Sequence, residues 1–342
     1  MLLNRYHTKE VNGTPMNYIV FDLEWNQPME SREKPNEKMP FEIIEIGAVK
    51  LNQNMEVVSS FSEVIRPSVY KEINHITKRL LHIDMKELKA GDGFVDVIER
   101  FLSWCGEDYI FCIWGTLDIT ELQRNMDYYD MKPIADKPLA YYDVQKLYSI
   151  ACEDKKTRRS LEYVVDELKL EKDIPFHRAY GDAFYTAKIL STLNNPEVLE
   201  KVSFDTYRVP KKKEDEIAIQ FSDYFKYISR EFSDKSEAIA DKRISSMTCY
   251  LCHKNIKRKI RWFTANTKHY YGVGYCDVHK HVKFKVRMKK SQTDNIYVVK
   301  TSKFISEDEY LDIKNKKEKA KLIKKDRKKK SKAAKTNPLK QD

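Results

Sequence analysis

Two acidic residues, Asp22 and Glu24, stand two positions apart at the end of an apolar segment that reads Tyr-Ile-Val-Phe-Asp-Leu-Glu. The side chains of a β-strand alternate between its two faces, so both carboxylates project from one face if this segment is a strand. Two like charges on one face repel each other unless a cation lies between them, and hard divalent ions readily bind carboxylate oxygens. The pair therefore predicts a divalent metal site and a metal-dependent enzyme.

Three further polar residues could complete such a site. Asp118 follows the apolar segment 109–114, and His177 and Asp182 lie five positions apart at the start of a helical pattern. Functional groups of α/β domains collect where strands end and helices begin. Taken singly, an aspartate at a helix start is more often an N-cap, and a loop histidine is more often structural or exposed. The ordered set of four carboxylates and one histidine favours a single catalytic centre.

The elements that must position these residues follow an α/β pattern. Segments rich in Val, Ile and Phe predict strands over 17–23, 41–51, 56–65 and 109–114. Helical spacing of apolar residues predicts helices around 92–104, 118–128, 159–169 and 180–193. Strands that come first, followed by strands alternating with helices, predict a mixed sheet covered by helices.

The same residues resemble the three sequence motifs of the DEDDh 3′→5′ exonucleases, relatives of RNase T, oligoribonuclease and the proofreading polymerase subunit. Asp22-x-Glu24 is similar to the first motif, Asp118 to the second, and His177-x4-Asp182 to the third. The surrounding segments FDLEW, IIEIGAV, WGTLD, SLEYVVDELKL and HRAYGDAFYTAKIL agree with them. The resemblance implies a ribonuclease H-like fold over roughly residues 17–195.

The details of the motifs narrow the resemblance. The tyrosine variant of this superfamily has its tyrosine four residues before the last aspartate, where this chain has Arg178, so the histidine subclass is implied. The form Trp114-Gly-x-x-Asp118 and the lead-in Ser160-Leu-Glu look most like the group of the histone-mRNA 3′ exonuclease and its bacterial relatives. That similarity implies RNA as the favoured substrate.

Phosphodiester hydrolysis needs an activated water and neutralisation of phosphate charge, which two Mg²⁺ or Mn²⁺ ions held by carboxylates can supply. We expect Asp22 to bridge both ions and Glu24 and Asp182 to complete one site, with Asp118 holding the second ion through waters. His177 is the expected general base, because an ordinary histidine titrates near neutrality.

Three residues near the acidic pair are candidates for substrate contacts. Trp25 follows the acidic pair and either packs in the core or stacks on the terminal base. Many relatives carry a Thr-Gly-Ile-Thr-like stretch where this chain has Ile73-Asn-His-Ile76-Thr77, which lacks the glycine. The resemblance implies substrate contacts for Ile76 and Thr77 at this stretch.

A second cluster lies late in the chain. Cys249 and Cys252 form one two-residue knuckle, and Cys276 and His279 form another, a spacing typical of one structural Zn²⁺ ion. His253 and His281 are alternative ligands, and three unrelated reduced cysteines are the alternative to a site. The intervening segment alternates basic and aromatic residues, which predicts a zinc-ribbon-like hairpin whose folding depends on the metal.

Charge divides the 342 residues unevenly. The formal net charge is +11, yet residues 254–342 hold 28 Lys and Arg against 9 Asp and Glu, a net of +19, which leaves −8 for residues 1–253. A basic C-terminal third predicts a polyanionic partner such as RNA, the ribosome or another RNA-rich assembly. Neither a membrane-spanning run nor a signal-peptide pattern is present, so we expect a cytoplasmic protein that does not bind membranes.

The expected organisation has five parts: an N-terminal extension at 1–16, an exonuclease domain at 17–195, a helical linker at 196–245 with an amphipathic helix over 214–242, a zinc module at 246–303 and a disordered Lys-rich tail at 304–342. Translation starts at either Met1 or Met16. The predicted function is a 3′→5′ exonuclease that prefers RNA and releases nucleoside 5′-monophosphates. The alternatives are a nucleic-acid-binding protein with a catalytically silent body, and a DNA-directed proofreading or repair exonuclease.

Overall fold

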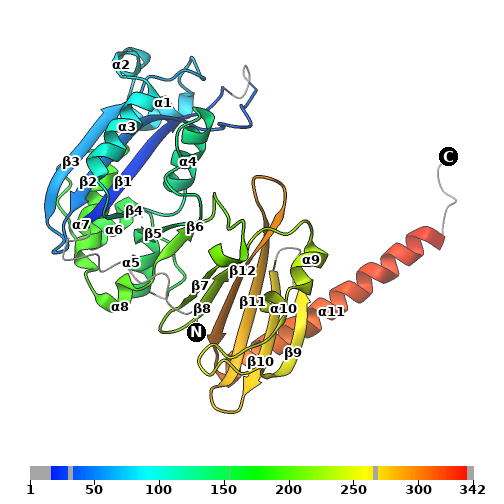
Figure 1. Ribbon diagram of the computed structural model, residues 1–342. Coiled ribbons are helices and arrows are strands. Elements are labelled where there is room, and N and C mark those ends of the chain that lie inside the picture. Colours follow the sequence, from blue (N-terminus) through cyan, green and yellow to red (C-terminus); the bar gives the residue numbers. More distant parts are fainter. Residues whose placement is uncertain (1–16, 30–33, 154, 265–268, 337–342) are drawn as a thin grey trace. The chain divides into compact units, whose positions relative to one another are not determined.

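The structure, a computed structural model, describes residues 17–29, 34–153, 155–264 and 269–336. The chain divides into two compact units, with the boundary between Arg208 and Val209. Within the described residues each unit is built on a six-stranded sheet (Figure 1). The predicted extension at 1–16, with its two possible start sites, lies outside the described residues.

The sheet of the first unit has the strand order β3-β2-β1-β4-β5-β6. Strands β3, β2 and β1 pair antiparallel, β1, β4 and β5 pair parallel, and β6 is antiparallel to β5. The strands are β1 (Asn17–Asn26), β2 (Glu42–Leu51), β3 (Val57–Val64), β4 (Tyr109–Ile113), β5 (Leu139–Asp143) and β6 (Ser203–Asp205). The predicted mixed sheet is confirmed, while β5 and β6 were not foreseen.

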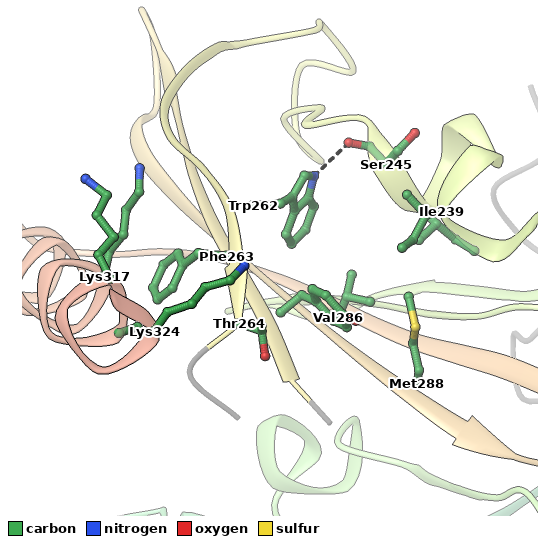
Figure 2. A pocket seen from close by; sticks show the side chains of 13 residues that line it. Ile239, Ser245, Trp262, Phe263, Thr264, Val286, Met288, Lys317 and Lys324 are labelled. Carbon is green, nitrogen blue, oxygen red and sulfur yellow. Dashed lines mark hydrogen bonds between the residues drawn. The ribbon is translucent and has the colours of Figure 1, made fainter. Parts of the chain in front are cut away.

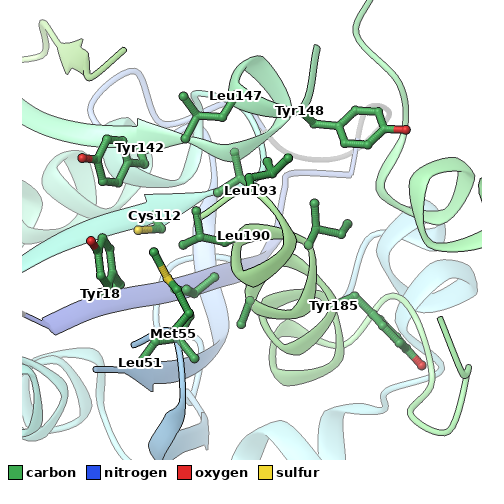
Figure 3. Packing of buried hydrophobic residues seen from close by; sticks show 14 of the residues in the cluster. Tyr18, Leu51, Met55, Cys112, Tyr142, Leu147, Tyr148, Tyr185, Leu190 and Leu193 are labelled. Carbon is green, nitrogen blue, oxygen red and sulfur yellow. The ribbon is translucent and has the colours of Figure 1, made fainter. Parts of the chain in front are cut away.

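Helices cover both faces of this sheet. They are α1 (His75–Leu81), α2 (Met85–Ala90), α3 (Phe94–Cys105), α4 (Asp118–Tyr128), α5 (Val144–Cys152), α6 (Leu161–Glu167), α7 (Ala179–Thr192) and α8 (Pro196–Leu199). On one face, a buried cluster joins Tyr18 and Val20 of β1 to Tyr185 of α7 (Figure 3). On the other face, Ile19 and Phe21 pack with α3 and α4. The alternation along β1 therefore separates two cores, as a period of two requires.

The second unit has an antiparallel sheet of strand order β7-β8-β12-β11-β10-β9. Its strands are β7 (Ile217–Gln220), β8 (Phe225–Ile228), β9 (Lys257–Thr264), β10 (His269–Cys276), β11 (Lys280–Lys290) and β12 (Ile296–Phe304). Its helices are the 3-10 turn η1 (Lys213–Asp215), α9 (Lys235–Ala240), α10 (Lys242–Ser245) and α11 (Glu307–Thr336). The predicted hairpin corresponds to β9 and β10, but it is part of a larger sheet.

The predicted amphipathic helix over 214–242 is wrong. This segment forms β7, β8 and the short helix α9 and ends where α10 begins, so the expected helical linker at 196–245 contributes strands to the second unit. Its Ile, Phe and Tyr residues suit a pleated surface, and β8 pairs with β12, where Ile228 lies opposite Val299. A partner some seventy positions away along the chain decides the conformation, and no local pattern reveals it.

The predicted disorder of the tail at 304–342 is also contradicted for its described part. Residues Glu307–Thr336 form the helix α11. Ile313 packs with Ile260 and Val273 of the sheet, and Tyr310 stacks on His281 with ring centroids 4.3 Å apart. The rest of the helix needs little apolar burial, because its hydrogen bonds are local and Lys, Ala and Leu are good helix formers.

Among the described residues, none of the helices has the length and apolar character needed to cross a membrane.

Candidate active site and candidate zinc site

The acidic pair lies on β1 as the sequence predicts. Asp22 and Glu24 share the face of β1 that carries Val20, which is the face covered by α7. Carboxylate oxygens of Asp22, Glu24 and Asp182 lie within 4.8 Å of one another. Two residues on one face of β1 and one residue in the first turn of α7 thus form a group of oxygen ligands of the kind that divalent ions require.

Two glycines allow α7 to bring Asp182 this close. Gly47 lies opposite Asp22 in the β1–β2 register, and a Cβ on it would lie 2.0 Å from the backbone nitrogen of Tyr180. A Cβ on Gly181 would lie 2.2 Å from the carbonyl oxygen of Pro175. Side chains at either position would push the first turn of α7 away from the sheet or from the loop before it. Neither glycine was predicted to have a role. The contacts of Gly47 are with residues far along the chain, and those of both glycines are mainly with backbone atoms, so no sequence motif reveals them.

Asp118 reaches the site from the neighbouring strand. It is the first residue of α4 and follows β4, which pairs in parallel with β1. The backbone N–H of Leu23 donates a hydrogen bond to its carboxylate. Asp118 lies outside the group whose oxygens are within 4.8 Å of one another, but its charge is the largest ionic influence on Asp22. All four predicted carboxylates therefore belong to one electrostatic unit.

The carboxylates hold protons unusually strongly. Burial, followed by repulsion from Asp118 and Glu24, raises the pKa of Asp22 well above its ordinary value. Burial and nearby negative charge raise the pKa of Glu24 to about 8, that of Asp118 to about 7 and that of Asp182 to about 6. The buried Oδ1 of Asp182 has no hydrogen-bond partner among the described residues. Crowded, repelling carboxylates with an orphaned oxygen fit a site for divalent cations.

His177 stands at the edge of this cluster. It lies in the loop before α7 with an exposed side chain and a φ of 61°. Its backbone N–H donates a hydrogen bond to Asp182, and its charge lowers the pKa of that carboxyl. The predicted general base is therefore adjacent to a predicted metal ligand.

An ion-pair network that the sequence did not reveal holds this loop. The Nε of Arg178 donates to both carboxylate oxygens of buried Glu45 at 3.1 and 2.9 Å, and its Nη2 donates to Glu87 at 3.0 Å. Glu45 lies opposite Glu24 in the β1–β2 register. Arg178 thus joins the loop that carries His177 to the strand beside the acidic pair.

The predicted substrate contacts lie near one another at the end of β1. Trp25 is half-buried against Phe41, with ring centroids 5.6 Å apart, and packs on the core that contains Phe21. The hydroxyl of buried Thr77 donates to the carbonyl of Trp25 at 3.3 Å, and Ile76 is half-buried at the start of α1. Packing of Trp25 matches one of the two expected roles, and base contacts by these three residues stay predictions.

The second unit brings Cys249, Cys252, Cys276 and His279 together, with ligand atoms within 4.8 Å of one another. The Sγ atoms of Cys252 and Cys276 are 3.6 Å apart, and Nδ1 of His279 lies 3.4 Å from Cys249 and 3.6 Å from Cys276. Tetrahedral zinc, with bonds of about 2.3 Å to sulfur and about 2.05 Å to nitrogen, requires about 3.8 Å between sulfurs and about 3.6 Å between sulfur and nitrogen. The donor set and its spacing fit zinc.

The alternative histidine ligands are placed elsewhere. His281 is buried, and its Nδ1 lies 3.2 Å from a carboxylate oxygen of Glu307. His253 adopts a φ of 56° directly after Cys252 and is exposed. Neither belongs to the cluster of four. Backbone N–H groups of Val278 and His279 donate to the Cys276 thiol and lower its pKa to about 6, which favours the thiolate that metals bind.

The sequence of the first unit matches a known family over residues 19–190, described as the RNase T exonuclease family. The match spans just over half of the chain, and the protein belongs to this exonuclease family.

Two curated relatives share parts of the same region. A probable 3′-5′ exonuclease, KapD, of Bacillus subtilis (strain 168) is 31% identical over 113 residues, covering 33% of this chain and 54% of that protein. The PolC-type DNA polymerase III of Clostridium perfringens (strain 13 / Type A) is 30% identical over 202 residues, covering 52% of this chain and 12% of that protein. The matches thus span about half of the first relative and a small part of the second.

Solved structures show a partial likeness. The nuclease domain of 3′hExo, a DEDDh family member bound to rAMP, has a TM-score of 0.45 at 18% identity, covering 57% of this chain and 98% of that one. Exonuclease I of E. coli with a dT13 oligonucleotide has a TM-score of 0.42 at 15% identity, covering 55% and 42%.

Proposed function

We propose that the first unit is a metal-dependent 3′→5′ exonuclease that releases nucleoside 5′-monophosphates from the end of a nucleic acid. The observation that carries the proposal is the approach of Asp22, Glu24 and Asp182 to within 4.8 Å, with Asp118 coupled to them by charge and His177 beside Asp182. Membership of the exonuclease family supports the reaction class.

The chain's own groups divide the work. Two Mg²⁺ or Mn²⁺ ions, when bound, would neutralise phosphate charge and activate a water. Asp22 would be shared between them, Glu24 and Asp182 would complete one set of oxygens, and Asp118 would serve the other. His177 is exposed and would accept the proton of the attacking water. We expect His177→Gln to lower kcat by about 10²–10⁴-fold with unchanged metal affinity, and a kcat within twofold of wild type would remove this role.

We also propose that RNA is preferred over DNA. The support is the resemblance of the second motif, Trp114-Gly-x-x-Asp118, to the histone-mRNA exonuclease group. The name of the PolC-type relative favours the alternative, a DNA-directed exonuclease. Matched RNA and DNA oligonucleotides with single-stranded 3′ ends decide between them, because their digestion rates differ only through the sugar.

For the second unit we propose one structural zinc ion and a role in holding nucleic acid. The four clustered ligands are the argument for zinc binding. The net charge of +19 over residues 254–342 is the argument for binding a polyanion such as nucleic acid. We also propose that the same charge lets the protein dock on the ribosome or another RNA-rich assembly.

The deciding experiment is digestion of labelled oligonucleotides with Mg²⁺ or Mn²⁺. Asp22→Ala should lower the rate more than about a hundredfold, since even groups that only support metal ligands are worth 10–100-fold. Asp136→Ala, which removes an exposed carboxylate of the same unit, is the matched control and should leave the rate unchanged. If wild type removes no 3′ nucleotides from either substrate, the catalytically silent binding protein becomes the better description. Activity retained in Asp22→Ala would assign the reaction to another site.

A further inference from the structure

The second unit contains a pocket of about 430 Å³ between its sheet and the helix α11, a size in the range of small-ligand sites. Its sides are apolar and aromatic, and the part formed by α11 is basic (Figure 2). The lining residues used below are Trp262, Tyr270, Lys317, Ala320, Lys321 and Lys324. The chemistry of the two sides differs, so a suitable ligand must have both a flat apolar part and negative charge.

The aromatic side is held in place by specific contacts. The Nε1 of Trp262 donates a hydrogen bond to the carbonyl of Ser245 at 2.9 Å (Figure 2). A Cβ on Gly272 would lie 2.2 Å from Cε of Met247 and 3.3 Å from the Trp262 ring, so this glycine leaves room for both side chains. Tyr270 is half-buried against the same core cluster as Trp262. Both rings line the pocket, and both are oriented before any ligand arrives.

The basic side is a row on one helix. Lys317, Lys321 and Lys324 recur at i, i+4 and i+7, which places them on one face of α11. Ala320 lies on the same face and lines the pocket, and its small side chain leaves space between the lysines and the sheet. Lys321 forms an ion pair with Glu318 at 2.8 Å, an exposed contact that a phosphate could replace at little cost.

From this arrangement we infer that the pocket is a binding site for single-stranded nucleic acid, in which a base stacks against Trp262 and Tyr270 and adjoining phosphates contact the α11 lysines. Every base offers a flat π-face to an aromatic ring, and phosphates pair with lysines without regard to sequence. A purely apolar ligand or peptide would offer the lysines no anion, and a duplex would keep its bases stacked. The inference rests on the proposed function only in taking nucleic acid as the substrate.

Binding can be measured apart from catalysis. We would use the full-length chain carrying Asp22→Ala and follow the fluorescence anisotropy of labelled single-stranded RNA and DNA of equal length. Tyr270→Leu removes the ring but keeps apolar volume, and Ala320→Phe fills the pocket without changing charge. Each should weaken binding roughly five- to a hundredfold, the range for loss of one stacked base. An abasic oligonucleotide should bind more weakly to the parent protein and be affected little by Tyr270→Leu.

The lysine row has a matched control on the same helix. Log affinity falls as log salt concentration rises. Replacing Lys317, Lys321 and Lys324 by Gln should make this slope shallower by about 2, because each phosphate contact to a single strand contributes about 0.7. The control variant, which changes three lysines that do not line the pocket, should change it by clearly less. These lysines are Lys316, Lys319 and Lys325.

The outcomes separate this inference from the proposed function. Equal losses in the two lysine variants, or unchanged binding in both Tyr270→Leu and Ala320→Phe, would overturn the pocket even if wild type digests 3′ ends. Selective losses would establish it even if wild type digests nothing. Binding of RNA, of DNA or of both that these variants weaken supports the inference, and binding of neither overturns it. Circular dichroism and zinc content of each variant show whether a loss reflects misfolding, and a variant that misfolds is replaced by Tyr270→Met or Ala320→Leu.

Discussion

Glu45 and Arg178 show how one residue pair can support a catalytic cluster without joining it. The side chain of Glu45 is 3% exposed and that of Arg178 is 33% exposed. The positive charge of Arg178 lowers the pKa of neighbouring Glu24, which partly offsets the repulsion among the carboxylates. A buried carboxylate is tolerated only when it is paired and hydrogen-bonded. Glu45 therefore needs Arg178, and the bond to Glu45 in turn holds the loop that carries His177.

Arg178→Met should leave the Glu45 carboxylate buried without its partner. Loss of a buried partner costs about 3–5 kcal/mol, but the partial exposure of Arg178 reduces the expected cost to about 1–3 kcal/mol of unfolding free energy. Adding Glu45→Gln should recover part of it. Arg100→Met breaks more exposed ion pairs with Glu63 and Asp92 and should cost clearly less. Denaturant titration of the three variants and of wild type measures these costs, and equal costs at Arg178 and Arg100 would contradict this role.

The protonation of the acidic residues predicts how pH couples to metal binding. The pKa of Glu24 is raised from 4.5 to about 8, so between these values the unfolded chain has lost a proton that the folded, metal-free chain keeps. The folded metal-free protein therefore loses stability as pH rises from about 4.5 to about 8, and the contribution is constant outside this window. A divalent cation bound to the carboxylate offsets the burial and the repulsion that raise this pKa.

The increase in Tm on adding Mn²⁺ should consequently be larger at pH 8 than at pH 6, because fewer protons compete with the metal. Glu24→Gln should reduce the difference between the two pH values. Calorimetric scans with and without the ion measure it. An equal increase at both pH values would show that the carboxylates of the site do not couple proton and metal binding.

At the scale of elements, the contact of α7 with β2 assembles the site. Gly47 lies on β2, directly opposite Asp22 in the sheet. Because it has no side chain, the first turn of α7 can lie against β2 at this point. Backbone atoms at 2.0 Å from an added Cβ cannot yield as a flexible side chain would.

Gly47→Ala should therefore displace α7, move Asp182 away from β1, and lower both stability and divalent-metal affinity. We expect a loss of about 3 kcal/mol or more in unfolding free energy and at least a tenfold loss in Mn²⁺ affinity. Gly93→Ala is the matched control, because the nearest atom to its added Cβ is 3.5 Å away and its φ of −69° suits any residue. Normal metal affinity in Gly47→Ala would show that α7 adapts without moving Asp182.

At the scale of the whole molecule, each unit has its own core. Cys249 and Cys276 are buried within one apolar cluster of the second unit, while a separate cluster around Tyr227 and Val286 lies elsewhere in the same unit. The zinc ligands therefore belong to a six-stranded unit larger than the module expected from the sequence. Loss of the metal should destabilise this unit instead of abolishing its fold.

Cys276→Ser should reduce bound zinc from about one ion per chain to well below one and lower the stability of the second unit by more than about 2 kcal/mol. Cys152→Ser, at an exposed cysteine outside the cluster, is the control and should change neither. Elemental analysis and thermal unfolding measure the two effects. Zinc content that is unchanged in Cys276→Ser would refute the ligand set.

Local patterns in the sequence determined much of the molecule. The period of two placed Asp22 and Glu24 on one face of a strand, and the strand is present. The two-residue spacing of each knuckle pointed to the four zinc-type ligands, which the structure brings together. These predictions succeed because neighbours along the chain fix their own relative geometry.

Tertiary structure alone decided the remainder. The segment 214–242 contains the strand β8 because β12 offers it a partner, and Gly47 matters because α7 approaches it. Glu45 and Arg178 lie 133 positions apart, and the pocket exists because a lysine row on α11 faces aromatic residues of the sheet. A sequence pattern specifies the periodicity of an element, whereas its partner is chosen by burial and pairing across the whole chain, which no local pattern contains.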